Sequence, residues 1–212
     1  MARITGLEPD PRRPGAVRVL VDGRLYCTVH EAALRAGRLT VGGEWSAEQA
    51  GVTGQAADEE AAWRALLKAL ERRSYATAEL RRRLVQKGHP PAAADFAVSR
   101  AREAGLLNDV EFARNFVQSR SARGRGPVRL RRDLAALGVA RELIEAALAA
   151  QWAEPEDSLA LAAELATKRA RQLAGLPREV RRRRLVAYLA RRGFSGAGVV
   201  DLVGRVLRSQ GG

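Results

Sequence analysis

The sequence of 212 residues is poor in the residue types on which most enzymes and secreted proteins depend. Its single cysteine, Cys27, excludes an internal disulfide framework and is typical of a reducing compartment. Its two histidines, His30 and His89, have no cysteine or second histidine at metal-ligand spacing. Neither G-x4-G-K-[ST] nor G-x-G-x-x-G occurs, so no phosphate-binding loop is recognisable. We therefore expect no enzymatic activity, no catalytic residue, no cofactor and no metal.

Long apolar segments are also missing. The longest stretch without a charged residue has nine residues, 49–57, whereas a membrane-spanning helix needs about 20 apolar residues. The N-terminal sequence MARITGLEPD carries charges and lacks the apolar core of a signal peptide. Aromatic residues make up 5% and do not alternate with basic ones, which argues against a base-stacking platform for single strands. We expect a cytoplasmic monomer with no membrane partner.

Arginine is what the sequence has in excess. Lysine and arginine together number 37 against 24 acidic residues, giving a net charge of +13, and only three of the 37 cations are lysine. Residues 1–57 are nearly neutral, so the excess belongs to residues 58–212. The planar guanidinium suits phosphate or carboxylate, and we expect an anionic partner. If that partner is single- or double-stranded DNA, we expect contacts to phosphates with little base readout.

The excess arginines form three groups that are candidate sites for binding DNA or an acidic protein. Dense groups of like charge repel themselves unless a partner or counterions neutralise them. The alternative is a solvated helix face in a chain that is rich in arginine throughout. The candidate residues are Arg81, Arg82 and Arg83 in the first group, Arg120, Arg123, Arg125, Arg129, Arg131 and Arg132 in the second, and Arg181, Arg182, Arg183 and Arg184 in the third.

The N-terminal segment has the pattern of a β-hairpin. Apolar residues alternate over 17–21 and again over 25–29, and Asp22-Gly23 stands between the two runs. This dipeptide favours a tight turn because it tolerates positive φ. A short helix is expected over 30–37, followed by a linker up to residue 57. Because so small a piece cannot form a core alone, we expect it to pack on the helical part of the chain.

From residue 58 the pattern is helical and contains an internal repeat. The motif L-x3-L-x3-G occurs three times, with two leucines on one helix face and a glycine where the chain must turn left-handed. A repeat of this length predicts a mainly α protein with three tandem three-helix units in an elongated, curved body. We place the units at 58–107, 108–153 and 154–212, after an N-terminal segment at 1–57. The motif residues are Leu80, Leu84 and Gly88, then Leu130, Leu134 and Gly138, then Leu185, Leu189 and Gly193.

The segment KALERRSYATAELRRRLVQKG contains the first motif. It is followed by REAGLLNDVEFARNFVQSR and then by GPVRLRRDLAALGV, which contains the second motif. Asn108 can cap a helix whose first turn contains Asp109 and Glu111, where the helix dipole favours negative charge. Phe112 and Ala113 would then face the core. Taken together, these segments resemble the RecX family of bacterial recombination regulators. The matching positions are Leu80, Leu84, Gly88, Gly105, Leu107, Asp109, Phe112, Ala113, Arg120, Gly126, Leu130, Leu134 and Gly138.

The resemblance implies tandem three-helix repeats that bind the RecA recombinase filament on DNA and damp strand exchange and ATP hydrolysis. Competition for a groove or interface of the filament and promotion of subunit loss are both open mechanisms. An alternative is a free-standing DNA-binding protein in which residues 127–150 mimic a helix-turn-helix. A third possibility, a nuclease that uses the acids at 58–60, has little support, because acids at a helix start compensate the dipole.

Overall fold

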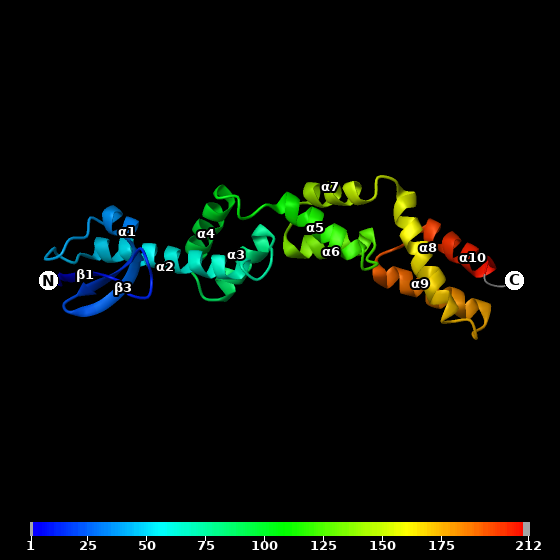
Figure 1. Ribbon diagram of the computed structural model, residues 1–212, viewed down its shortest axis with the longest axis horizontal. Helices are drawn as coiled ribbons and strands as arrows, with labels where there is room; N and C mark the ends of the chain where they lie inside the picture. The colour runs from blue at the N-terminus through cyan, green and yellow to red at the C-terminus, as the bar shows by residue number, and fades with distance from the viewer. Residues whose placement is uncertain (1, 210–212) are drawn as a thin grey trace. The chain divides into compact units, whose positions relative to one another are not determined.

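The computed structural model describes residues 2–209, except for the side chains of Ala32, Ala36, Pro155 and Glu156. Over this range the chain forms three strands and ten helices, and its contacts divide it into two compact units (Figure 1). The first unit holds the chain up to Tyr75 together with Glu79–Leu107, and the second holds Ala76–Ala78 and the chain from Asn108 onward. The predicted fold class, mainly α with three three-helix repeats and a small N-terminal β segment, is confirmed.

The N-terminal β segment is a three-stranded antiparallel sheet with the order β1-β2-β3. The predicted hairpin is formed by β2 (Ala16–Val21) and β3 (Arg24–His30), and both turn residues, Asp22 and Gly23, have positive φ. The additional strand β1 (Ile4–Pro9) pairs with β2 and was not predicted. Its sequence ITGLEP lacks a clear alternation and contains glycine and proline, both of which are rare in strands.

The prediction of a linker up to residue 57 is wrong, because a helix begins ten residues earlier, at Ala47. The short helix α1 (Glu31–Ala36) is followed by helix α2 (Ala47–Leu70), whose N-cap residue, Ser46, forms a capping box with Gln49. The first half of α2 packs Ala56 and Ala57 against the buried core of the sheet, and this packing stabilises a helical segment that contains two glycines. The acids at 58–60 consequently lie in the middle of α2 and not at a helix start.

The first repeat is formed by the second half of α2 with α3 (Thr77–Gln86) and α4 (Pro91–Glu103). Both motif leucines of α3, Leu80 and Leu84, are fully buried. They pack with Leu66 of α2 and with a row of small residues on α4 that allows this helix to lie close to α2: Ala93, Ala94, Ala97 and Ala101.

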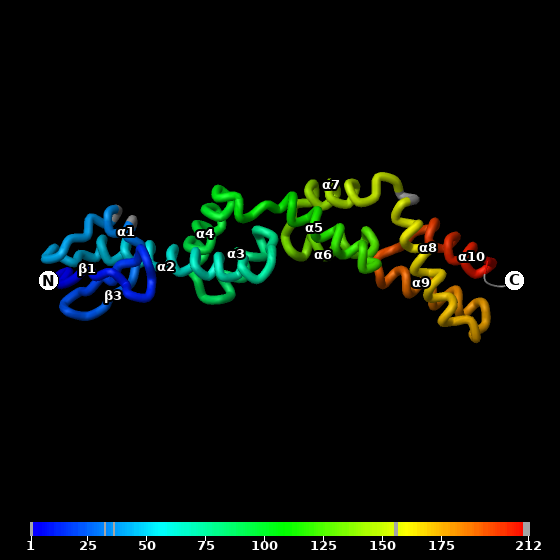
Figure 2. Tube along the Cα trace, viewed as in Figure 1, coloured from blue at the N-terminus to red at the C-terminus, as the bar shows by residue number. Residues whose placement is uncertain are grey.

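The second and third repeats lie in the second unit. Helices α5 (Asp109–Ser121), α6 (Pro127–Leu137) and α7 (Arg141–Gln151) form one, and α8 (Pro155–Arg171), α9 (Arg178–Arg192) and α10 (Ala197–Ser209) form the other. Each has its own core around the two motif leucines of its middle helix, α6 or α9, and Figure 2 shows the trace of the six helices. All three motif glycines have the predicted left-handed conformation, with φ of +91° at Gly88, +87° at Gly138 and +93° at Gly193.

The two repeats of the second unit are joined through backbone contacts at one junction. The turn after α9 meets the start of α6, where the amide of Gly126 donates to the carbonyl of Arg192 (2.7 Å) and the amide of Val128 donates to that of Gly193 (3.1 Å). These bonds satisfy amides at a helix N-terminus that no residue of α6 could satisfy. A Cβ on Gly193 would collide with the backbone nitrogen and Cβ of Arg129, so only glycine allows this approach.

Candidate anion-binding surface

The three groups of arginines are positioned by the middle helix of each repeat and the turns beside it. Arg81, Arg82 and Arg83 lie on α3 in the first unit. The second group lies on α5, on the α5–α6 turn and on α6. The third lies on the N-terminal half of α9, and this helix carries seven arginines and one glutamate over its whole length. These helices expose the arginines because their leucines occupy the core on the opposite side.

One arginine in each of the first two repeats is committed to an ion pair between helices. Arg81 of α3 binds Asp95 of α4, and Arg131 of α6 binds Glu145 of α7 through both carboxylate oxygens, at 2.6 Å from Nε and 2.8 Å from Nη2. The hydrogen bonds from the guanidinium groups lower the pKa of Asp95 and of Glu145 below their ordinary values. These two arginines hold the second and third helices of their repeats together.

Asp133 neutralises two further candidates in the second group. Its carboxylate accepts hydrogen bonds from Arg125 Nη1 at 2.6 Å and from Arg129 Nε at 2.9 Å, and its side chain is only 19% exposed. The shared acid connects the α5–α6 turn to α6. Arg125 and Arg129 therefore stabilise the second repeat and contribute less charge to its surface than the sequence suggests.

Two other candidates lie over aromatic rings. The guanidinium of Arg83 is 5.7 Å from the centre of the Tyr75 ring, and that of Arg120 is 5.0 Å from the centre of the Phe116 ring. Each distance allows a cation–π interaction. Both side chains are half-buried and lie against aromatic rings of the protein itself.

Five candidates are exposed, and within residues 2–209 they form no ion pair: Arg123, Arg132, Arg182, Arg183 and Arg184. All five lie in the second unit. Arg82 and Arg181 take part in other interactions and are not counted with them. Exposed guanidinium groups that no carboxylate neutralises can donate two parallel hydrogen bonds to a phosphate or carboxylate of a partner.

The structure places further basic residues beside the candidates. Arg192 Nη1 donates to the carbonyls of Arg123 and Gly124, both at 3.2 Å, and thereby links the second and third groups at the junction. Arg178, Arg205 and Arg208 lie with Arg182 along a hollow between α9 and α10. Arg205 and Arg208 are three residues apart on a helix, a spacing that indicates a shared face. The sequence does not tell that this face lies beside α9.

Within the described range, no three His, Cys, Asp or Glu side chains lie close enough together to hold a metal ion, and no helix is long and apolar enough to cross a membrane. Cys27 is half-buried in β3, and burial raises the pKa of its thiol, which disfavours the nucleophilic thiolate. Asn108 caps α5 by accepting from the amides of Val110 and Glu111, as predicted. Asp109 has an unpredicted second role, because its carboxylate accepts from the amide of Thr77 at 2.8 Å.

Comparisons with known proteins agree with this architecture. Models of the RecX family match the chain three times, as the first three-helix domain at residues 62–100, the second at 108–148 and the third at 156–197. A protein named regulatory protein RecX from Pseudomonas savastanoi pv. phaseolicola (strain 1448A / Race 6) is 36% identical over 148 residues, which cover 68% of this chain and 87% of that protein. One from Streptomyces coelicolor is 38% identical over 124 residues, or 58% of this chain and 64% of that protein.

Solved structures show the same fold. A crystal structure of regulatory protein RecX superposes with a TM-score of 0.78 at 24% identity and covers 97% of this chain and 100% of that one. The crystal structure of RecX from Lactobacillus salivarius gives a TM-score of 0.61 at 18% identity and covers 72% of this chain and 97% of that one.

Proposed function

The chain belongs to the RecX family of regulatory proteins, and from this membership we propose that it binds the RecA–DNA filament and inhibits the recombinase in DNA repair and recombination. In this proposal it acts in the cytoplasm, without catalysis of its own. Binding to the filament reduces strand exchange and the ATP hydrolysis that accompanies it.

The observation that carries the proposal is the set of exposed, unpaired arginines in the second unit. Arg123 and Arg132 belong to the second repeat, and Arg182, Arg183 and Arg184 belong to the third. A filament on DNA presents phosphates, and a planar guanidinium binds a phosphate with two parallel hydrogen bonds. Binding on this surface would release counterions from the DNA and would weaken as the salt concentration rises.

The paired arginines have a different role in the proposal. Arg81, Arg125, Arg129 and Arg131 are engaged by Asp95, Asp133 and Glu145. They keep the middle helices of the first two repeats, α3 and α6, in place, so that Arg132 on α6 faces the partner from a rigid surface. The protein then inhibits by occupying a groove or subunit interface of the filament that strand exchange requires.

A free-standing role in reading DNA sequence is less well supported. In a helix-turn-helix the second helix, here α7, would present polar side chains to base edges in the major groove. Only Arg141, Glu142 and Glu145 are available near its start, and Glu145 is already bound to Arg131. Among the candidate arginines on this pair of helices, Arg132 is exposed and has no ion pair, and it lies on the first helix, which favours contact with the phosphate backbone.

The proposal is tested by removing two unpaired arginines and comparing the result with a matched loss of charge elsewhere. The variant R123Q/R132Q should weaken binding to preformed RecA filaments on single-stranded DNA by about tenfold, which corresponds to about 0.7 kcal/mol for each lost contact. The control R12Q/R35Q removes two exposed arginines from the N-terminal segment and has the same net charge. It should bind within about twofold of the wild type, as measured by fluorescence anisotropy of labelled filaments.

Equal loss in the two variants would show that net charge alone drives binding and would remove this surface from the proposal. An unchanged affinity for R123Q/R132Q would have the same consequence.

A further inference from the structure

The third repeat differs from the other two at one pair of positions. Arg81 and Asp95 of the first repeat correspond, 50 residues later, to Arg131 and Glu145 of the second, and both pairs form an ion pair between the middle and last helices. A further 55 residues along, the same two positions are Val186 on α9 and Val200 on α10. The third repeat thus presents two apolar side chains where the others present a closed pair of charges.

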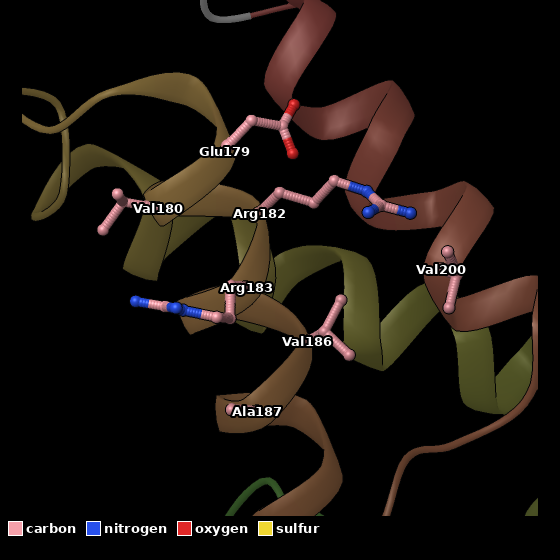
Figure 3. A pocket seen from close by; sticks show the side chains of 7 residues that line it. All are labelled: Glu179, Val180, Arg182, Arg183, Val186, Ala187 and Val200. Atoms are coloured by element: carbon pink, nitrogen blue, oxygen red, sulfur yellow. The ribbon is translucent and has the colours of Figure 1, made fainter.

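These valines belong to an open hollow between α9 and α10. The hollow has a volume of about 710 Å³, and its lining includes Val180, Val186, Ala187 and Val200, all of which are half-buried. Figure 3 shows Val186 and Val200 on either side of the space between the two helices, and Arg182 reaching from α9 toward α10. In the second repeat the corresponding hollow, of about 580 Å³, is lined by the Arg131–Glu145 ion pair itself.

The rim of the hollow is basic. Arg182 and Arg183 line the apolar part, and an adjoining polar part is lined by Arg178, Arg205 and Arg208. Two acids, Glu179 and Asp201, lie among these five arginines, so the rim keeps a net positive charge.

This combination discriminates between classes of partner. A phosphate backbone would use the arginines and would gain nothing from the valines, since it has no apolar side chains to bury. A protein segment with apolar residues on one side and carboxylates beside them would use both, by burying its apolar side chains and pairing its carboxylates with arginine.

We propose that the hollow between α9 and α10 is a docking site for an acidic, amphipathic segment of a partner protein. Its apolar side chains would cover Val186 and Val200, and its carboxylates would bind Arg182 and Arg183. This inference rests on the proposed function and deepens it, because it assigns the segment to the recombinase subunits of the filament. Arg182 and Arg183 then contact protein at the hollow, while the other exposed arginines, Arg123, Arg132 and Arg184, contact phosphate.

The experiment restores in the third repeat the ion pair that the second repeat has. The double variant V186R/V200E leaves the net charge unchanged and places a cation and a carboxylate across the hollow. It should weaken binding to preformed RecA filaments by about tenfold or more. Binding to the same single-stranded DNA without recombinase should stay within about twofold, because no charge is lost. Circular dichroism would establish that both proteins have the same helical content.

A milder variant keeps the test decisive if the double variant does not fold. Val200 lies outside the buried core of the third repeat, so V200Q should fold and should weaken filament binding by about three- to tenfold, the effect of losing one valine contact. V110Q is the matched control, because Val110 is 50% exposed on α5 of the same unit. It should bind like the wild type.

The possible failures are distinguishable. If the wild type binds filaments and V186R/V200E and V200Q bind them equally well, the docking site is refuted and the proposed function stands. If the variants lose affinity for naked DNA to the same extent as for filaments, the hollow serves nucleic acid, and the assignment to an acidic protein segment is overturned. If the wild type does not bind filaments at all, the proposed function itself fails.

Discussion

Replacing Gly193 by alanine tests the junction between the second and third repeats. The glycine has a φ of +93°, and a Cβ there would overlap the backbone nitrogen of Arg129 at the start of α6. Alanine therefore has two costs. The left-handed conformation costs about 1–2 kcal/mol for a residue with a Cβ. The overlap forces the two backbones apart and breaks the hydrogen bonds of Gly126 and Val128 to the α9–α10 turn, at about 1 kcal/mol each.

The expected loss for G193A is thus about 3–4 kcal/mol in the free energy of unfolding of the second unit. Gly196 provides a control three residues away, because its φ is +107° and a Cβ would meet nothing within 4 Å. G196A should cost only the conformational part, about 1–2 kcal/mol.

The assay is urea unfolding followed by the fluorescence of Trp152, which packs against the core of the second repeat. The substitutions W45F and W63F remove the tryptophans of the first unit, so the emission reports the second unit alone. Equal losses for G193A and G196A would refute the close contact at the junction. A difference of about 2 kcal/mol, the value of the two hydrogen bonds, would support it.

Three further predictions concern the interior of α2, the ion pair between α6 and α7, and the salt dependence of DNA binding. Gly54 lies in the interior of α2 and a Cβ there meets nothing within 4 Å, so G54A should raise the free energy of unfolding by about 0.5–1 kcal/mol in urea titrations, and a decrease would contradict the helix. Arg131 lowers the pKa of Glu145 in the folded protein. The ion pair therefore stabilises the fold at a pH above the pKa of an unfolded glutamate, about 4.3, and this stabilisation is lost as the pH falls through the lower pKa of the folded state. E145Q should therefore be less stable than wild type by about 0.2–1 kcal/mol at pH 7 and equal to it near pH 2, and a pH-independent difference would refute the pairing. For DNA alone, contacts to about six phosphates give a log–log salt slope near −5, and R123Q/R132Q should make it shallower by about 2 units, whereas an unchanged slope would show that these arginines do not contact phosphate.

The repeats could be predicted from the sequence because they rest on local rules. The motif of two leucines four residues apart followed by a glycine can be recognised in the sequence, and it predicts a positive φ at the glycine. All three copies, at Gly88, Gly138 and Gly193, have this conformation. The first half of α2 and strand β1 could not be predicted, because tertiary packing outweighs their weak propensities. Gly51 and Gly54 disfavour a helix that the sheet nevertheless stabilises through Ala56 and Ala57.

The candidate site was only partly visible in the sequence for a similar reason. Arginines adjacent in sequence are easily grouped, but whether each one is free depends on acids in another helix. Arg131 and Glu145 lie 14 residues apart, and their pairing follows from how α6 and α7 pack. The internal repeat contained one signal for this pairing, because Arg81 and Asp95 in the first repeat are separated by the same number of residues as Arg131 and Glu145 in the second. The hollow in the third repeat could not be predicted, because it depends on Val186 and Val200 replacing an ion pair that only the structure shows in the other two repeats.

The central claim is that this member of the RecX family acts on the recombinase filament. The most direct measurement is ATP hydrolysis by preformed RecA filaments on single-stranded DNA as the protein is titrated in, with a matched series of binding to the same DNA alone. We predict inhibition at concentrations well below those that saturate naked DNA. No inhibition, together with tight and salt-sensitive binding to DNA alone, would contradict the claim and would favour a general DNA-binding protein.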